Sequence, residues 1–228
     1  MKALYATCAV LDVIWCAKLL TAPRNTLNCS KMQRFFSLYG LFPLILGIAF
    51  AQQSERIYLR NASFEGEPGH DRTPTGWYSC TLSSTPDIFP GAWGIKHVQP
   101  QHGATCLGLT VRDDGTTEDI SQALGEKLIA GNCYTFKIWL AHTDSYVGYN
   151  RPARIRVWGG TSRGKKECLL DTSPVISGSE WKEYRFQFMA KGDYTHLTLE
   201  AWYAPGCGFY RGNILLDNCS SIQRCNRA

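Results

Sequence analysis

The sequence lacks the motifs by which many hydrolases and metal enzymes can be identified. Its five histidines form no HExxH pair, no GxSxG motif precedes a helix, and no CxxC or Cys/His cluster has zinc spacing. From Ile57 onward it has little helical periodicity, and it contains no internal repeat, low-complexity tract or interdomain linker. These absences argue against an enzyme and against a helical protein.

A surplus of basic charge is also missing from most of the chain. Of the 24 basic and 19 acidic side chains, residues 1–51 hold five and one, so residues 52–228 hold 19 and 18. A nearly neutral body has no basic surface of the kind that nucleic acid requires. No nucleic-acid partner is therefore predicted.

One apolar run, FFSLYGLFPLILGIAF at 35–50, suggests a targeting segment. A short positive start at 32–34 precedes it, and small residues at Ala49 and Ala51 occupy the positions that signal peptidase reads. A membrane anchor is the alternative, but the run is shorter than the roughly 20 residues of a spanning helix, and Pro43 interrupts it. We predict a signal peptide at 32–51, a protein that is secreted, periplasmic or on the cell surface, and no transmembrane anchor in the mature chain.

Residues 1–31 are interpreted as a spurious upstream extension, with Met32 as the true start. The mature chain, 52–228, has a suitable length for one domain with a sizeable core. It keeps seven cysteines, and an oxidising compartment allows disulfides, although their connectivity is left open. An odd number leaves at least one thiol free. Cys106 and Cys133 lie in strand-like runs, where we expect them as buried small apolar residues.

Short β-like runs separated by Gly, Pro, Asn and Asp fill the mature chain. The clearest predicted strands are 106–111, 133–142, 153–159, 183–189, 196–203 and 213–222, with a strand and a turn over 121–131. Many short strands at fairly regular spacing predict an all-β fold, an antiparallel β-sandwich.

Alternation along these strands separates two faces. The predicted core face comprises Phe136, Ile138, Leu140, Ile155, Val157, Tyr184, Phe186, Phe188, Leu197, Leu199 and Ala201. The opposite face comprises Lys137, Trp139, Arg154, Arg156, Trp158, Arg185, Gln187, Glu200 and Trp202. Three tryptophans mixed with arginines, a carboxylate and an amide are unusual for a plain solvent face.

An ordered set of motifs covers nearly all of the mature chain. LRNASFEGEP, TGW (75–77), GATCLGL (103–109), SQALGEKLIAGNCYTFKIWLA (121–141), EWKEYRFQF (180–188) and ILLDNCSSI (214–222) follow one another. This set resembles the carbohydrate-binding-module type of galactose-binding-like jelly roll. SSTPDIFPGAW (83–93), LGLTVRDDGTTEDISQAL (107–124) and YRGNILLDN (210–218) resemble a subgroup in secreted or envelope proteins of Gram-negative bacteria. The inserted loops depart from the carbohydrate modules.

The resemblance implies one structural Ca²⁺, held by Glu65 of the opening motif and Asp217 of the closing strand. Calcium prefers oxygen ligands such as these carboxylates. The alternative is that Glu65 and Asp217 only cap or pair at strand ends.

The aromatic face predicts a binding site for a polysaccharide or other glycan. Sugar rings need flat aromatics for their apolar faces and polar groups that fork onto hydroxyls. The predicted ligand-binding residues are Trp139, Arg154, Arg156, Trp158, Gln187, Glu200 and Trp202, with Tyr146 and Tyr149 closing over one edge. The alternative is that 83–93 folds across this face and buries the tryptophans.

The acidic run RDDGTTED, 112–119, offers paired carboxylates of the kind that glycosidases use. Its composition is that of a tight turn between two strands, and EF-hand spacing is missing. We predict a hairpin in which Arg112 pairs with Glu118, and no catalytic residues.

Together these observations predict a secreted, non-catalytic glycan-binding module at 52–228. A structural or protein-interaction domain of the cell envelope, partnered by other envelope proteins, is the second hypothesis. An activity associated with glycoside hydrolases is the third.

Overall fold

The computed structural model of the protein describes residues 56–225. The predicted upstream extension at 1–31 and signal peptide at 32–51 lie outside these residues. Within 56–225, no helix is long and apolar enough to cross a membrane.

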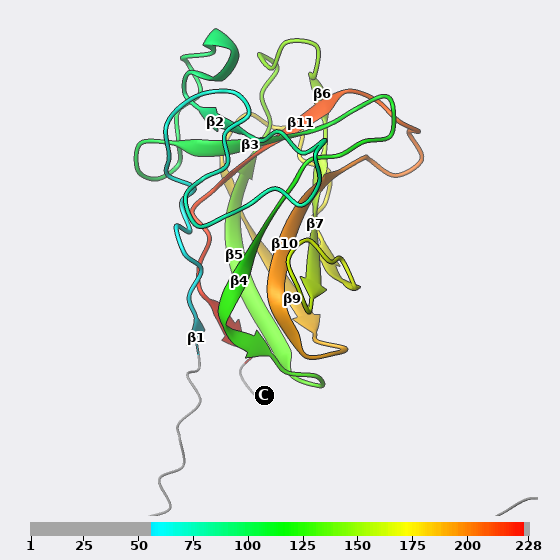
Figure 1. Ribbon diagram of the computed structural model, residues 1–228. Helices are drawn as coiled ribbons and strands as arrows, with labels where there is room; N and C mark the ends of the chain where they lie inside the picture. The colour runs from blue at the N-terminus through cyan, green and yellow to red at the C-terminus, as the bar shows by residue number, and fades with distance from the viewer. Residues whose placement is uncertain (1–55, 226–228) are drawn as a thin grey trace, which may run out of the picture. The chain divides into compact units, whose positions relative to one another are not determined.

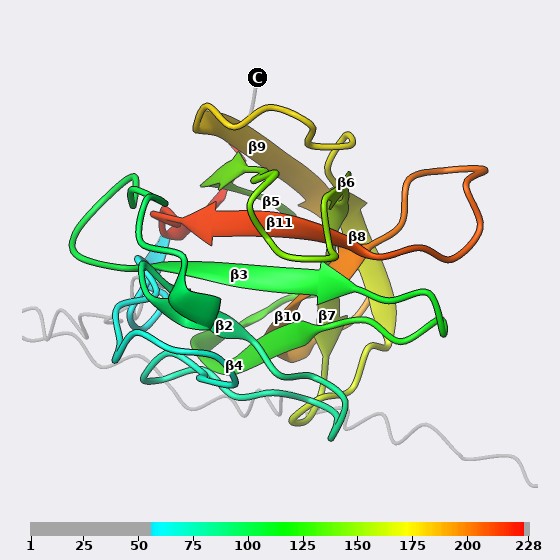
Figure 2. The same ribbon diagram turned by 90° about the horizontal axis from the view of Figure 1, so that it is seen from above.

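Two β-sheets face each other in a sandwich (Figures 1 and 2). The first sheet contains β1 (Arg56–Ile57), β2 (Asp87–Phe89), β3 (Cys106–Val111), β5 (Cys133–Ala141), β6 (Arg151–Pro152), β9 (Lys182–Met189), β11 (Gly212–Asp217) and β12 (Ile222–Arg224). The second contains β4 (Asp119–Leu128), β10 (Tyr194–Trp202), β7 (Arg154–Gly160) and β8 (Cys168–Thr172), in that order across the sheet. Within 56–225, the strand pairs are antiparallel except β6 with β11. The predicted all-β jelly-roll class is confirmed.

The predicted strands agree closely with the observed ones, with one exception. The run 213–222 was expected as a single strand, but β11 ends at Asp217 and β12 begins at Ile222. Asn218 has a φ of 48°, and its backbone N–H donates to the Asp217 carboxylate at 2.7 Å. A left-handed residue interrupts a strand, and asparagine tolerates that conformation better than most side chains.

The sandwich interior holds the predicted core, in which every predicted residue is buried except Tyr184, which packs partly buried against it. The prediction that the residues of the opposite face share one surface is wrong. Trp139 and Gln187 lie on β5 and β9 of the first sheet, whereas Arg154 to Trp158 and Glu200 to Trp202 lie on β7 and β10 of the second. Alternation along a strand identifies inward and outward positions, but it does not say which strands share a sheet.

A small second core covers part of the outer face of the first sheet. Its buried members are Phe89, Ala92, Ile95, Val98, Cys106, Ala141, Tyr146 and Leu215. The Phe89 ring crosses β3 so closely that a Cβ on Gly108 would lie 2.6 Å from it, so this position requires glycine. The segment 83–93, one of those that resemble the envelope subgroup, therefore covers part of this sheet.

One disulfide, Cys133–Cys225, joins the start of β5 to the residue after β12. Among the described residues Cys80, Cys106, Cys168, Cys207 and Cys219 are free. Cys106 is buried as expected, but the expectation for Cys133 is wrong because it is disulfide-bonded. The antiparallel pairing of β5 with β12 brings the two cysteines together.

Candidate functional site

A pocket of about 240 Å³, called here the loop pocket, lies where β2, β3 and three loops converge. Its lining residues are Thr85, Asp87, Trp93, Thr110, Arg112, Glu118, Tyr146, Val147 and Tyr149. They come from the β1–β2 connection, β2, the short 3₁₀ turn η1 (Ala92–Gly94), β3, the β3–β4 loop and the β5–β6 loop. An apolar hollow with a few convergent polar groups is the usual form of a small-ligand site.

Asp87 is a buried carboxylate at this pocket. Its Oδ1 accepts a hydrogen bond from the Asp71 backbone N–H at 3.0 Å, and its Oδ2 accepts from the Trp93 indole at 2.9 Å and from the Tyr146 hydroxyl. Burial raises the pKa of Asp87, while these donors oppose the rise. The carboxylate therefore holds two aromatic rings of the pocket in place.

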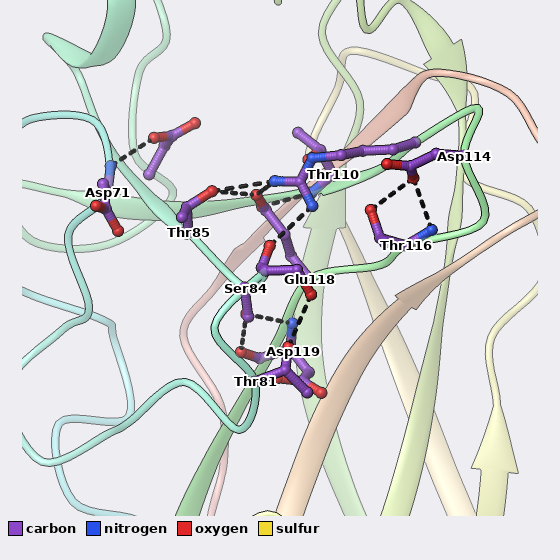
Figure 3. Close-up of polar contacts among 12 residues, drawn as sticks. Asp71, Thr81, Ser84, Thr85, Thr110, Asp114, Thr116, Glu118 and Asp119 are labelled. Carbon is purple, nitrogen blue, oxygen red and sulfur yellow. Dashed lines mark hydrogen bonds and ion pairs between the residues drawn. The ribbon is translucent and has the colours of Figure 1, made fainter.

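Glu118 is the second buried carboxylate, with an exposed fraction of 1%. The Thr110 backbone N–H donates to its Oε2 at 2.9 Å, and the Thr85 hydroxyl donates to its Oε1 at 3.0 Å (Figure 3). Arg112 forms an ion pair with Oε1, as predicted. Burial raises the pKa of Glu118 to about 7, because desolvation outweighs the Arg112 charge and nearby Asp87 adds to the rise.

The predicted hairpin over 112–119 is confirmed as a tight turn, but the strands that it joins, β3 and β4, belong to different sheets, so the pairing stops at the bridge between Val111 and Thr117. Gly115 has a φ of 87°, the Arg112 N–H donates to the Thr116 carbonyl at 3.0 Å, and Asp114 accepts from the Thr116 N–H and hydroxyl (Figure 3). The run is divided by exposure: Asp113 and Asp114 face solvent, whereas Glu118 and Asp119 are buried. Of these four carboxylates, only Glu118 lines the pocket.

Aromatic rings border the loop pocket. Trp93 is 61% exposed, has a φ of 55°, and stacks beside the His70 ring with centroids 4.7 Å apart. The Tyr146 and Tyr149 rings meet edge to face with centroids 6.1 Å apart. Tyr146, predicted to close over a sugar, is 2% exposed and contributes instead to the pocket wall. The pocket thus combines one open indole face with buried acceptors and a guanidinium.

The raised pKa of Glu118 gives a prediction for stability. In the folded protein Glu118 keeps a proton that the unfolded chain releases above pH 4.5. The contribution of Glu118 to the free energy of unfolding is therefore complete below pH 4.5 and is lost as the pH rises through about 7. Relative to the Glu118→Gln variant, wild-type protein should lose up to about 1.4 kcal/mol of unfolding free energy per pH unit in this window. Urea unfolding across the window measures the difference, with the exposed Glu67→Gln variant as control. Parallel curves for wild type and Glu118→Gln would contradict it.

Five of the predicted ligand residues lie together on the outer face of the second sheet. The Arg156 guanidinium lies 3.6 Å from the Trp202 ring centroid, and the Trp158 indole donates to Glu200 at 2.7 Å. Arg154 is directly opposite Trp202 in the β7–β10 register. Burial lowers the pKa of Arg156, while nearby Glu200 opposes this.

A lysine engages the acidic groups of this second-sheet face. Lys166, from the β7–β8 connection, lies 2.6 Å from Glu200 and 2.5 Å from Asp119. Glu200 also accepts from the Thr117 hydroxyl at 3.2 Å. The carboxylate expected to bind sugar hydroxyls is therefore engaged by an ion pair and two hydrogen bonds from the protein itself.

The two residues predicted to hold calcium lie on either side of one loop. Asp217 is fully buried and accepts from the Gln101 and His102 backbone N–H groups at 2.8 and 2.9 Å, and from the Ser63 hydroxyl and Asn218 N–H. Glu65 accepts from the Ala104 and Thr105 N–H groups at 3.1–3.2 Å. N–H donors point at both carboxylates where a cation would need to sit, so the arrangement fits a loop anchor better than a calcium ion. Calcium binding stays a prediction from the resemblance.

Sequence reasoning missed the pocket residues Asp87, Trp93 and Thr85, and it assigned Arg112 and Glu118 only a structural role. The available signal was the insertion SSTPDIFPGAW, which places an acid and an indole six residues apart. Nothing in the sequence shows that this insertion meets the β5–β6 loop.

Comparisons with known proteins indicate the fold but no family. No family model matches the chain, and no curated protein matches it. A cyclase from Fischerella sp. TAU is 13% identical over 75% of this chain and 98% of its own, with a TM-score of 0.50. The CBM22-1 xylan-binding domain of Paenibacillus barcinonensis Xyn10C is 15% identical over 75% and 96%, with a TM-score of 0.48. The CBM22-1-CBM22-2 tandem domain of the same protein is 16% identical over 78% and 49%, with a TM-score of 0.49.

At these identities the similarity concerns the fold alone. The predicted two-sheet β-sandwich is observed in the structure of this chain itself. One sandwich of this kind can host unrelated functions, so function has to be argued from the sites of this chain.

Proposed function

We propose that this domain is an exported, non-catalytic glycan-binding module and that the loop pocket takes one sugar ring of its ligand. The observation that carries the proposal is the open Trp93 indole beside the buried Asp87 and Glu118 carboxylates and Arg112. An indole face suits the apolar C–H face of a sugar, and charged acceptors and a guanidinium suit its hydroxyls. The volume of about 240 Å³ is below the roughly 300 Å³ of the smallest drug-sized sites, which favours a single ring or a chain end.

The bonding state of the two carboxylates supports binding rather than catalysis. Each accepts three hydrogen bonds or ion-pair contacts from the protein, out of about four lone-pair positions, which leaves about one position for a ligand hydroxyl. A carboxyl group that protein donors hold on most sides is poorly placed to transfer a proton to a glycosidic oxygen. The Cys133–Cys225 disulfide supports export, because such bonds persist in oxidising compartments.

Trp93→Ala should weaken binding to the glycan recognised by wild-type protein at least about tenfold, equivalent to about 1.4 kcal/mol. The loss is expected because the variant removes the only pocket ring that is mostly exposed. A glycan array on the purified protein identifies the ligand, and titration calorimetry measures the affinity. Tyr58→Ala, which removes another exposed aromatic outside the pocket, is the matched control.

Trp93→Phe separates stacking from the indole hydrogen bond to Asp87, and we expect it to retain most of the affinity. Unchanged affinity in Trp93→Ala would exclude the loop pocket as the site. Absence of any array ligand for the wild type would favour the second hypothesis, an envelope protein-interaction domain. The closed ion-pair network around Glu200 is the observation in favour of that hypothesis.

A further inference from the structure

A second groove, called here the polar groove, crosses the outer face of the first sheet over β5, β9 and β12. Its volume is about 560 Å³, more than twice that of the loop pocket. Among the described residues that line it, none is acidic. No residue of the loop pocket lines it, so the two sites are distinct.

Strand register arranges the groove side chains in two rows. Gln187 and Gln223 lie directly opposite Thr135 on its two sides. Two residues further along β5, Lys137 lies opposite Arg185, and its backbone N–H and C=O bond to Ser220 at 2.9 and 2.8 Å. Outward residues of one strand recur about every 7 Å, so an amide and hydroxyl row is followed at that spacing by a cationic row.

The cationic row lowers the stability of the sheet. Like charges directly opposite each other destabilise an antiparallel pair. Glu183 compensates Lys137 at 2.6 Å, but among the described residues Arg185 makes no ion pair. Arg185 is exposed, and Arg224 adds a further guanidinium to the lining. A groove that concentrates cations without an acidic lining residue is complementary to an anion.

We propose that the polar groove binds a polysaccharide bearing carboxylate or sulfate groups. Arg185 pairs with the anionic groups, beside Lys137, which is already engaged by Glu183, and guanidinium groups match planar carboxylate and sulfate oxygens well. Gln187 and Gln223 donate to and accept from the hydroxyls of the adjoining sugar. The Thr135 hydroxyl, which donates to the Phe186 carbonyl at 2.9 Å, accepts from them. Nucleic acid is a poorer match, because the only aromatic lining residue, Phe136, is buried and no ring is available for base stacking. The inference takes from the proposed function only that the ligand is a glycan.

The test compares affinities of the full chain for polygalacturonate, heparin, neutral xylan and duplex DNA at low salt. We expect the wild type to bind polygalacturonate or heparin, and Arg185→Glu to weaken this at least about tenfold. The two polyanions distinguish carboxylate from sulfate as the preferred group. Lys96→Glu applies the same charge change at an exposed position outside the groove and should have little effect. Arg185→Gln and Gln187→Ala, both at exposed positions, are milder variants in case reversal impairs folding.

The inference would be overturned by failure of both polyanions to bind, by equal losses in Arg185→Glu and Lys96→Glu, or by equally tight binding of DNA. Trp93→Ala distinguishes the polar groove from the loop pocket of the proposed function, because this variant should leave polyanion binding intact. Loss of array binding in Trp93→Ala with unchanged polyanion binding in Arg185→Glu would support the loop pocket and reject the groove. The reverse pattern would support the groove alone.

Discussion

Asp217→Ala is expected to lower the free energy of unfolding by about 3–5 kcal/mol. The fully buried carboxylate accepts from the Gln101 and His102 backbone N–H groups and from Ser63, which are distant in sequence. Alanine leaves these donors without their partner, and each unsatisfied buried donor costs about 1–3 kcal/mol. Urea unfolding of wild type and variant measures the loss.

Glu67→Ala, at an exposed carboxylate, is the control and should change stability by less than about 0.5 kcal/mol. The same samples distinguish a loop anchor from a calcium ligand. For a loop anchor, added Ca²⁺ and EDTA leave the wild-type melting temperature unchanged. A melting temperature that Ca²⁺ raises in wild type and not in Asp217→Ala would instead assign Asp217 to a metal site.

Simultaneous replacement of Cys133 and Cys225 by alanine is expected to cost about 4 kcal/mol of stability. The bond closes a loop with a sequence separation of 92 residues, and its removal gives the unfolded chain many additional conformations. Denaturant unfolding of the double variant, compared with the wild type under non-reducing conditions, measures the effect.

Cys207→Ala is the matched control for this variant, because Cys207 is free and exposed. It should leave the unfolding curve in place. Equal stabilities of the wild type and the Cys133→Ala/Cys225→Ala variant would contradict the expectation. Addition of reductant gives an independent check, since it should destabilise the wild type and leave the double variant unchanged.

The second-sheet face, the loop pocket and the polar groove use the same sandwich in different ways. On the second-sheet face Lys166 pairs with Glu200 and Asp119, the loop pocket is built from β2, β3 and the loops around them, and the polar groove lies on exposed strand faces. In the last two, binding groups are placed by rigid strands or by buried hydrogen bonds. Such placement limits the conformational entropy that a ligand would have to remove.

The sequence by itself determined the longer strands and the core, whereas β2, β6 and β8 were not predicted. Alternation of apolar and polar residues along 133–141 and 183–189 places Phe136, Ile138 and Phe186 inward, because successive side chains of a strand point to opposite faces. It also determined the hairpin at 112–119 and the Arg112–Glu118 pair, since both depend on contacts a few residues apart.

Only the tertiary structure decided which outward residues share a surface. Trp139 and Gln187 occupy outward positions of their strands, as Trp158 and Trp202 do, yet they belong to the other sheet. Strand order depends on contacts between residues far apart in the chain, as does the meeting of Asp87 with Tyr146 at the loop pocket. Local patterns carry no information on such pairings, because one strand face can be buried equally well beside several different neighbours.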